Sequence, residues 1–174
     1  FEIVASKQFG YRNKLQIPVR EVNGKPECGF YRENSHDITP ISKCLLQSEV
    51  SAKLIAVVKE FMTEYKISAY NEITGRGVVR HIVSREFGSK IAIVIVINAN
   101  KLPNADKLVE KLKKIFPDFS LFINIHKEKT NVVCSDCYIK IYGNDKLTGE
   151  MNFVKLEISP QSFLQVNIKT AARL

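Results

Sequence analysis

Residues 91–97 read Ile91-Ala92-Ile93-Val94-Ile95-Val96-Ile97, and every one of them is apolar. Successive side chains of a strand point to opposite faces of its sheet, so a strand is apolar throughout only when both faces are covered. The run therefore predicts a central strand over Ile91–Asn98. The segment Gly77–Glu86 predicts its neighbour, because Phe87-Gly88-Ser89-Lys90 between the two has the composition of a turn.

Further strands are expected on both sides of this pair. Tyr11–Val22 alternates in the manner of a strand, and Asn23-Gly24-Lys25-Pro26 is a turn signal, so Cys28–Glu33 is expected to return as the second arm of a hairpin. More strands are predicted nearer the C-terminus, over Phe119–His126, Tyr138–Tyr142 and Met151–Ile158. Pro160 ends the last of them, because proline has no N–H to give to a ladder.

Helices are expected between the strands. Ser48 predicts the cap of one helix, and a second helix is expected between Pro103-Asn104 and Pro117. The inward positions are Val50, Leu54, Val57, Val58, Phe61 and Tyr65 in the first helix and Leu108, Val109, Leu112, Ile115 and Phe116 in the second. Because no strand–helix–strand alternation is sustained, the order of elements predicts an α+β fold, a mostly antiparallel sheet with two packed helices.

Length and composition indicate a single basic domain. The chain has 174 residues, of which 45% are hydrophobic, and its formal net charge of +8 favours a polyanion such as nucleic acid as partner. No apolar run reaches membrane-spanning length and no signal peptide is present, so we expect no membrane partner and a cytoplasmic setting. The first residue is Phe1 rather than Met, which suggests a piece of a longer sequence.

Basic and aromatic residues gather on the predicted hairpin and on the strand that follows the first helix. On the hairpin we expect Tyr11, Arg12, Lys14 and Arg20 to face Phe30, Tyr31 and Arg32. The later group is Arg76, Arg80 and Arg85. Guanidinium groups fork onto phosphates and rings stack on bases, so both groups are candidates for RNA contacts, with an ordinary solvated sheet face as the alternative. Thr74-Gly75-Arg76-Gly77 lacks the Lys-Ser/Thr ending of a phosphate loop, and its glycines are interpreted as turn formers.

A polar and aromatic string, Ser162-Phe163-Leu164-Gln165-Val166-Asn167, follows the last predicted strand. Amides at Gln165 and Asn167 beside the ring of Phe163 indicate a site that reads the edge of a planar ligand while stacking on its face. The alternative is that Ser162 caps a helix beginning at Phe163, with both amides solvated.

The cysteines argue against a disulfide framework and for reduced thiols or metal ligands. Cys134-Ser135-Asp136-Cys137 has the spacing of half a zinc site, which Cys28 and Cys44 could complete only through the fold.

A series of motifs stands in a recognisable order along the chain. They are Tyr11-Arg12-Asn13-Lys14, His36-Asp37-Ile38, Tyr70-Asn71-Glu72, Thr74-Gly75-x-Gly77-x-x-Arg80-His81, Asn124-Ile125-His126 and Thr130-Asn131-Val132-Val133. Together with the string at Ser162–Asn167, they resemble the S-adenosylmethionine-dependent RNA uracil-5-methyltransferases, and within that family the bacterial 23S ribosomal RNA enzymes. The resemblance covers nearly all of the chain. It implies that residues 1–157 form the central α+β RNA-recognition domain and that 158–174 begin a truncated methyltransferase domain.

The resemblance also implies roles for individual residues. Gln165 matches the glutamine that lines the S-adenosylmethionine site, and Phe163 the aromatic near the flipped target base. Cys44 stands where the family places the fourth cysteine of a 4Fe-4S cluster, whose other ligands would precede Phe1. With the residues singled out above from the basic groups and the polar string, the predicted substrate-binding residues are Phe163, Asn167, Arg12, Lys14, Arg76 and Arg80. In the family the nucleophilic cysteine and the glutamate base follow the string, so catalytic residues are expected beyond the chain end.

The expected function is RNA recognition within a 23S rRNA (uracil-5-)-methyltransferase that transfers a methyl group to carbon 5 of a uridine. Transfer RNA is the alternative substrate, and the fragment is expected to be inactive alone. The rival interpretations are a free-standing RNA-binding module and a zinc-binding interaction domain. No oligomeric state is predicted.

Overall fold

The computed structural model describes residues 5–173 of the chain. In sequence order its elements are β1 (Lys14–Val22), β2 (Lys25–Tyr31), β3 (Ile38–Pro40), α1 (Glu49–Glu64), β4 (Val79–Phe87), β5 (Lys90–Ile97), α2 (Ala105–Lys113), β6 (Phe119–Ile125), β7 (Tyr138–Tyr142), β8 (Leu147–Met151), β9 (Val154–Ile158) and α3 (Ile168–Ala171). The expected domain limits at residues 1 and 174 lie outside the described residues, and the division at 157/158 stays a prediction.

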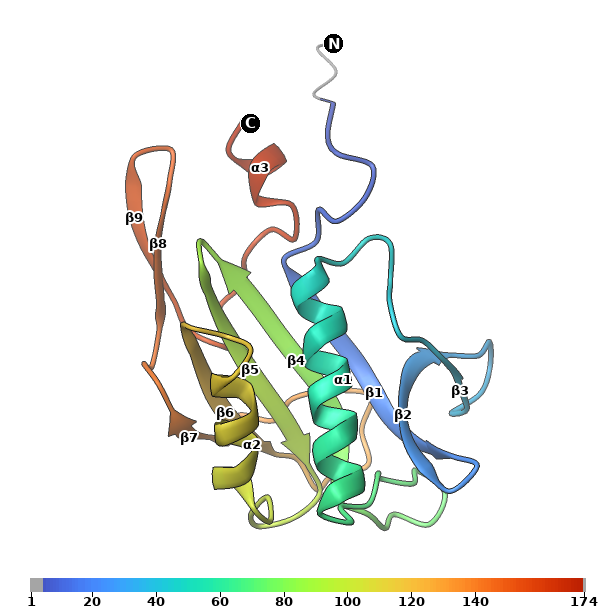
Figure 1. Cartoon of the computed structure of the whole chain (residues 1–174). Coiled ribbons are helices and arrows are strands. Elements are labelled where there is room, and N and C mark those ends of the chain that lie inside the picture. The colour runs from blue at the N-terminus through green and yellow to red at the C-terminus, as the bar shows by residue number, and fades with distance from the viewer. Residues whose placement is uncertain (1–4, 174) are drawn as a thin grey trace.

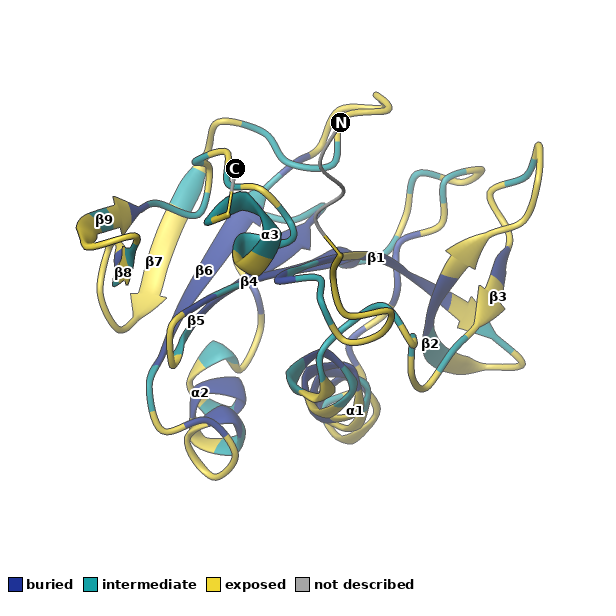
Figure 2. Ribbon diagram, turned by 90° about the horizontal axis from the view of Figure 1, so that it is seen from above, coloured by how far each residue is buried: buried dark blue, intermediate teal, exposed yellow. Residues whose placement is uncertain are grey.

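One sheet organises the chain. Its strand order is β3-β2-β1-β4-β5-β6-β7, while β8 and β9 form a separate hairpin. Every neighbouring pair is antiparallel except β5 and β6, which run parallel and are connected through α2. Helices α1 and α2 lie side by side on one face of the sheet (Figures 1 and 2). The predicted α+β fold with a mostly antiparallel sheet is confirmed, and the parallel pair and the short α3 are additions to it.

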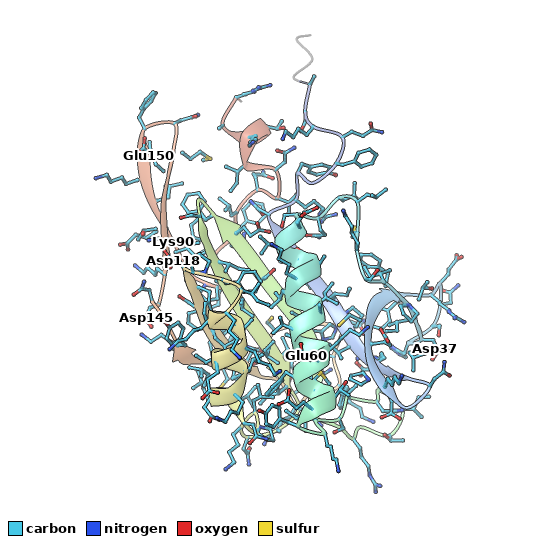
Figure 3. The ribbon with its side chains drawn as sticks, in the orientation of Figure 1. Asp37, Glu60, Lys90, Asp118, Asp145 and Glu150 are labelled. Atoms are coloured by element: carbon cyan, nitrogen blue, oxygen red, sulfur yellow. The ribbon has the colours of Figure 1, made fainter. Side chains whose placement is uncertain are left out.

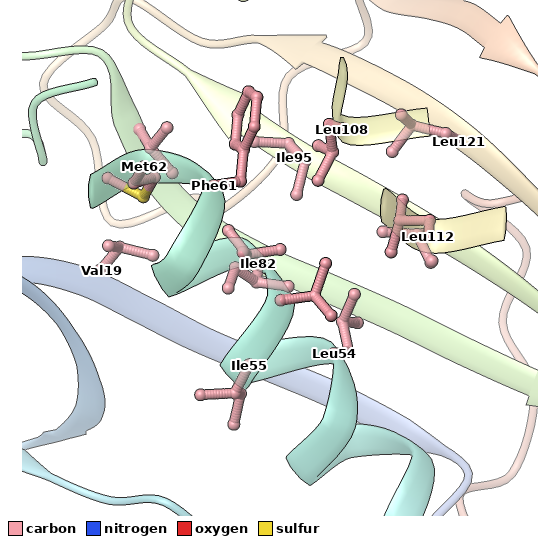
Figure 4. Packing of buried hydrophobic residues seen from close by; sticks show 14 of the residues in the cluster. Val19, Leu54, Ile55, Phe61, Met62, Ile82, Ile95, Leu108, Leu112 and Leu121 are labelled. Atoms are coloured by element: carbon pink, nitrogen blue, oxygen red, sulfur yellow. The ribbon is translucent and has the colours of Figure 1, made fainter. Parts of the chain in front are cut away.

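The apolar strand β5 is buried on both faces, as its sequence predicts. Ile91, Ile93, Ile95 and Ile97 belong to a core shared with α1 and α2 (Figure 4). Ala92, Val94 and Val96 belong to a second core on the opposite face. That second core is covered by Leu147 of β8, Ile158 of β9 and the partly buried Leu164 and Ile168. Burying one such isoleucine contributes about 1.5–3 kcal/mol, so covering both faces makes β5 a large source of stability.

Two hairpins each turn through two consecutive residues with positive φ. The first has Asn23 at φ 52° and Gly24 at φ 74°, as the turn signal between β1 and β2 predicts. The second turns at Asn152 and Phe153, with φ of 50° and 64°, between β8 and β9. The predicted single strand over Met151–Ile158 is therefore wrong, since it includes this turn. The sequence does not indicate this turn, because Phe153 occupies a position that usually requires glycine.

Both predicted helices are present, but details of their ends and faces differ from expectation. Ser48 stands at the N-cap of α1, yet its hydroxyl donates to Glu86 of β4 instead of accepting from the helix. Ile115, expected to point inward, is 39% exposed because α2 ends at Lys113 and the chain turns there. No helix begins at Phe163, and the Ser162 hydroxyl accepts from the backbone N–H of Ser159.

Ion pairs tie the two long helices together on the outer side. Lys111 of α2 places its Nζ 2.6 Å from Glu60 Oε1 and 2.7 Å from Glu64 Oε2 of α1. Glu60 is labelled on α1 in Figure 3. These solvent-exposed pairs contribute little stability, so packing against the sheet holds the helices in place.

The C-terminal segment returns to the start of β1. The backbone N–H of Asn13 donates to the carbonyl of Val166 at 2.9 Å, and Arg173 Nη1 donates to the carbonyl of Ala5 at 3.2 Å. The two ends of the described chain therefore lie close together (Figure 1). Among residues 5–173, no helix has the length and apolarity needed to cross a membrane.

Candidate nucleic-acid interface

The face of the sheet opposite α1 and α2 carries the polar side chains of β1 and β4. On β1, Leu15, Ile17 and Val19 point to the helices, so the intervening Lys14, Gln16 and Arg20 point to the opposite face. His81 and Arg85 of β4 share that face with Val83, which belongs to the second core. Residues of the loop 126–137, with Pro160 and Gln161 of the C-terminal segment, border this surface.

Two adjoining hollows open on this face. The first, of about 400 Å³, we call the Lys14 hollow, and its polar lining includes Lys14, Gln16, Arg85, Asn131, Ser135, Asp136, Tyr138 and Gln161. The second, of about 720 Å³, we call the Tyr31 hollow, and its polar lining includes Tyr31, Arg32, His36, Glu72, Arg80, His81, Lys129, Thr130 and Asn131. Asn131 and Val133 line both, so the hollows meet at this loop.

The Lys14 hollow contains two cations without a carboxylate partner. Lys14 and Arg85 are directly opposite each other in the β1–β4 ladder. Among the described residues, every ion pair involves other side chains, and Arg85 has only a 3.4 Å hydrogen bond to the carbonyl of Leu164. Burial, and next the charge of Arg85, lowers the pKa of Lys14. Like charges facing each other across a ladder destabilise a sheet, so this pair is suited to an anion that neutralises it.

The Tyr31 hollow rests on a buried network of charges. Arg20 pairs with Glu72 at 2.7 Å, and Arg80 Nη2 lies 3.8 Å from the same carboxylate. Arg80 is 2% exposed, and its Nη1 donates to the carbonyls of His126 and Glu128 at 2.9 and 2.7 Å. Its guanidinium also lies 4.5 Å from the ring centre of Tyr70. Arg80 thus holds the start of the loop that separates the hollows, and its direct contact with RNA stays a prediction.

Two buried histidines, His81 and His126, adjoin this network. His81 is 6% exposed, and burial, followed by the charges of Arg20 and Arg80, lowers its pKa to about 3. Its Nε2 lies 3.5 Å from the Tyr31 hydroxyl. His126 places Nδ1 3.2 Å from the carbonyl of Val133 and Nε2 3.2 Å from the Thr130 hydroxyl. These contacts hold the loop 126–137 against the sheet.

The C-terminal string has a fixed backbone with exposed side chains. Asn13 Nδ2 donates to the carbonyl of Gln165 at 2.9 Å, while the Gln165 side chain is exposed and Phe163 is 84% exposed. Asn167 caps α3 by accepting from the backbone N–H of Thr170 at 3.2 Å, and its Nδ2 donates to the Ser6 hydroxyl at 2.7 Å. Its amide is therefore engaged within the protein. Gln165 and Asn167 line a hollow of about 530 Å³ that also includes Tyr11.

The remaining predicted RNA contacts lie apart from the two hollows. Arg12 is half-buried and lines a separate hollow of about 560 Å³ with Lys169 and Arg173. Arg76 is exposed in the turn that begins at Asn71, and it belongs to the lining of neither the Lys14 nor the Tyr31 hollow. The structure thus brings Lys14 next to Arg85, while Arg12 and Arg76 stand elsewhere, and their roles stay predictions.

The cysteines do not assemble a ligand set within residues 5–173, where no group of three or more His, Cys, Asp or Glu side chains is placed to hold a metal ion. Cys44 is a half-buried free thiol in the segment before α1. One thiolate does not fit a 4Fe-4S cluster by itself, so a ligand role for Cys44 depends on cysteines outside the described residues and stays a prediction.

Several groups at this surface were not predicted from the sequence. Glu72, which joins Arg20 to Arg80, is one, and Gln161 and Tyr138 beside the Lys14 hollow are others. In the sequence, Glu72 is a lone carboxylate close to several arginines. A buried guanidinium needs a carboxylate partner, so this closeness was the available signal for Glu72. Gln161 and Tyr138 are brought together only by the fold.

Known proteins similar to this chain are RNA methyltransferases. No protein-family model matches it. An uncharacterized RNA methyltransferase of Caldanaerobacter subterraneus is 37% identical over 171 residues, covering 96% of this chain and 38% of that protein. One of Clostridium acetobutylicum is 35% identical over 162 residues, covering 91% of this chain and 35% of its own length. The crystal structure of Pyrococcus abyssi tRNA (uracil-54, C5)-methyltransferase in complex with S-adenosyl-L-homocysteine matches with a TM-score of 0.78 and 25% identity, over 96% of this chain and 40% of that one.

The chain belongs to the RNA uracil-5-methyltransferase family. The family resemblance of the sequence motifs is thereby confirmed. The chain spans well under half the length of these relatives, so each match covers one part of the relative. Within this part, the polar face of the sheet is the candidate interface for RNA, because it gathers cations without carboxylate partners.

Proposed function

We propose that this chain is the RNA-recognition region of an RNA uracil-5-methyltransferase and that it binds RNA across the Lys14 hollow. The observation that carries the proposal is the directly opposed pair of Lys14 and Arg85, neither of which forms an ion pair although Asp136 lines the same hollow. Two cations held at this spacing by a ladder form a rigid receptor for a phosphate, and the charge of +8 attracts RNA to it. The RNA methyltransferases among its relatives support the same assignment.

For the whole protein we propose transfer of a methyl group to carbon 5 of a uridine in 23S rRNA, in the cytoplasm. S-adenosylmethionine supplies the methyl group when it is bound. Gln165 and Tyr11 fit one side of its site, because an exposed amide and a half-buried ring line the same hollow. Asn13 holds the backbone of Gln165 so that this amide points outward. The exposed ring of Phe163 is proposed to stack on the flipped uridine, whose removal from the RNA stack costs a few kcal/mol.

The full-length protein is expected to form 5-methyluridine in 23S rRNA when supplied with S-adenosylmethionine. Nucleoside mass spectrometry after nuclease digestion measures the product, with transfer RNA as a parallel substrate. Methylation of transfer RNA alone would overturn the ribosomal assignment. Absence of 5-methyluridine from both RNAs would overturn the proposed activity and favour a free-standing RNA-binding module.

Replacing Lys14 with glutamine is expected to weaken RNA binding by this chain about equally for all sequences. One lost phosphate contact lowers the slope of log affinity against log salt by about 0.7 for single-stranded RNA. Fluorescence anisotropy titrations at several salt concentrations measure both the affinity and the slope. Glutamine retains a polar chain of similar length, so the half-buried position stays filled.

The matched control is Lys53→Gln, which removes one exposed charge from α1 on the opposite face of the sheet. This variant lowers the net charge by the same amount, and its affinity and salt slope are expected to stay close to those of the unmodified chain. If both variants lose the same affinity, binding depends on net charge alone and the proposed site is wrong.

A further inference from the structure

We infer that the Tyr31 hollow binds a nucleotide of single-stranded RNA, on the same strand as the phosphate at the Lys14 hollow and several positions away from it. This inference rests on the proposed function, because both hollows belong to one RNA path. It adds a second contact point, at which a base is held by stacking.

The lining of the Tyr31 hollow has an excess of positive charge. Arg32, Arg80 and Lys129 contribute cations to it, and Glu72 is the one carboxylate in that lining. Glu72 is already shared between two buried arginines, Arg20 and Arg80. His81 adds no charge near neutral pH, because its pKa is lowered to about 3. Arg32 and Lys129 are exposed, so both are available to a phosphate at the mouth of the hollow.

Tyr31 is held in position as a stacking platform. Its hydroxyl accepts a hydrogen bond from Arg20, whose guanidinium lies 5.3 Å from the ring centre. The ring of His36 stands edge-on to it, with centroids 6.2 Å apart and an interplanar angle of 84°. Tyr31 nevertheless remains 42% exposed. An exposed ring fixed by a buried ion pair loses little freedom when a base stacks on it.

The two hollows lie along the β-strand β1. Arg20, which supports Tyr31, is six residues beyond Lys14 on β1, a separation of about 20 Å at 3.3 Å per residue. Asn131, exposed on the loop between the hollows, lines both of them and offers an amide to a base edge. At about 3.4 Å per stacked nucleotide, roughly six nucleotides of RNA cover the distance from Lys14 to Arg20. Fewer nucleotides cover it if the RNA is extended.

The stacking platform selects single-stranded RNA. In a duplex each base is already stacked and paired, so its face is closed to Tyr31. Unpaired bases present a π-face regardless of sequence, and loss of one aromatic platform costs roughly 5- to 150-fold in affinity. A long single strand is therefore expected to engage both hollows at once, whereas a three-nucleotide RNA is too short to span the roughly 20 Å between them.

The test uses the chain of residues 1–174, fluorescein-labelled single-stranded RNAs of three and twelve nucleotides, and a duplex of the longer sequence. Tyr31→Ala is expected to weaken binding of the twelve-nucleotide RNA at least about fivefold, with the salt slope unchanged because no phosphate contact is lost. The same variant is expected to bind the duplex as the unmodified chain does, and the unmodified chain is expected to bind the three-nucleotide RNA, which occupies one hollow at a time, more weakly than the longer RNA. Tyr31→Phe, which retains the ring, is expected to retain the affinity for the longer RNA.

The outcomes separate this inference from the proposed function. If Lys14→Gln weakens binding while Tyr31→Ala does not, the second contact point is wrong and the proposed function stands. If Tyr31→Phe loses as much affinity as Tyr31→Ala, the hydroxyl network and not stacking is responsible, which overturns the inference. If neither Lys14→Gln nor Tyr31→Ala alters binding, the proposed RNA site itself is wrong. Circular dichroism melts of each variant verify that it is folded.

Discussion

Arg80→Ala is expected to lower the free energy of unfolding by roughly 3–5 kcal/mol, the cost of removing one partner from a buried ion pair. The guanidinium is 2% exposed and serves three groups at once, the carboxylate of Glu72 and the carbonyls of His126 and Glu128. Alanine leaves both carbonyls without their donor and weakens the neutralisation of Glu72. Urea denaturation followed by circular dichroism measures the change.

Arg76→Ala is the matched control for this prediction. Arg76 precedes Arg80 in the same arginine-containing segment but is exposed, so its loss is expected to change stability by no more than about 0.5 kcal/mol. Arg80→Lys keeps a positive charge beside Glu72 without the planar fork that serves both carbonyls, and we expect an intermediate loss. Equal stability of the Arg80→Ala and Arg76→Ala variants would show that the buried network does not hold the loop.

Acidification from pH 7 to pH 5 is expected to destabilise the protein through His81. Its pKa is about 3 in the folded protein, against 6.5 for an ordinary histidine. Below pH 6.5 the unfolded chain takes up a proton that the folded protein excludes, so stability falls as the pH falls and is unaffected well above 6.5. At pH 5 this amounts to about 2 kcal/mol, from roughly 1.5 pH units at 1.36 kcal/mol each.

The difference between the unmodified chain and His81→Gln isolates this effect from the protonation of carboxylates. Glutamine has no proton to take up in this range, so the variant is expected to lose less stability between pH 7 and pH 5. An NMR titration that places the His81 pKa near 6.5 would contradict the prediction directly.

Local patterns in the sequence predicted the main elements correctly. The uninterrupted apolar run of β5 indicated burial on both faces, and the structure divides its side chains between two cores. The turn signal at Asn23-Gly24 gave the first hairpin because glycine and asparagine tolerate positive φ. These features depend on residues close in sequence, and such short-range preferences can be recognised without a partner strand.

Features that depend on distant residues could not be predicted in the same way. Lys14 and Arg85 face each other because β1 pairs with β4 across the whole of α1, and nothing in either segment specifies that register. Arg20 was expected on an open surface, but its pairing with Glu72 allows it to be buried. The turn between β8 and β9 was missed because Phe153 adopts a conformation that its side chain disfavours.

The closeness of Ala5 and Arg173 has a consequence for engineering this protein. A polypeptide whose ends meet can be joined there by a short linker and reopened at a surface loop without distorting its interior. The exposed Gly88-Ser89 turn between β4 and β5 offers such an opening. The same closeness would let the unit sit as an insert within a host protein, entering and leaving through neighbouring points on its surface.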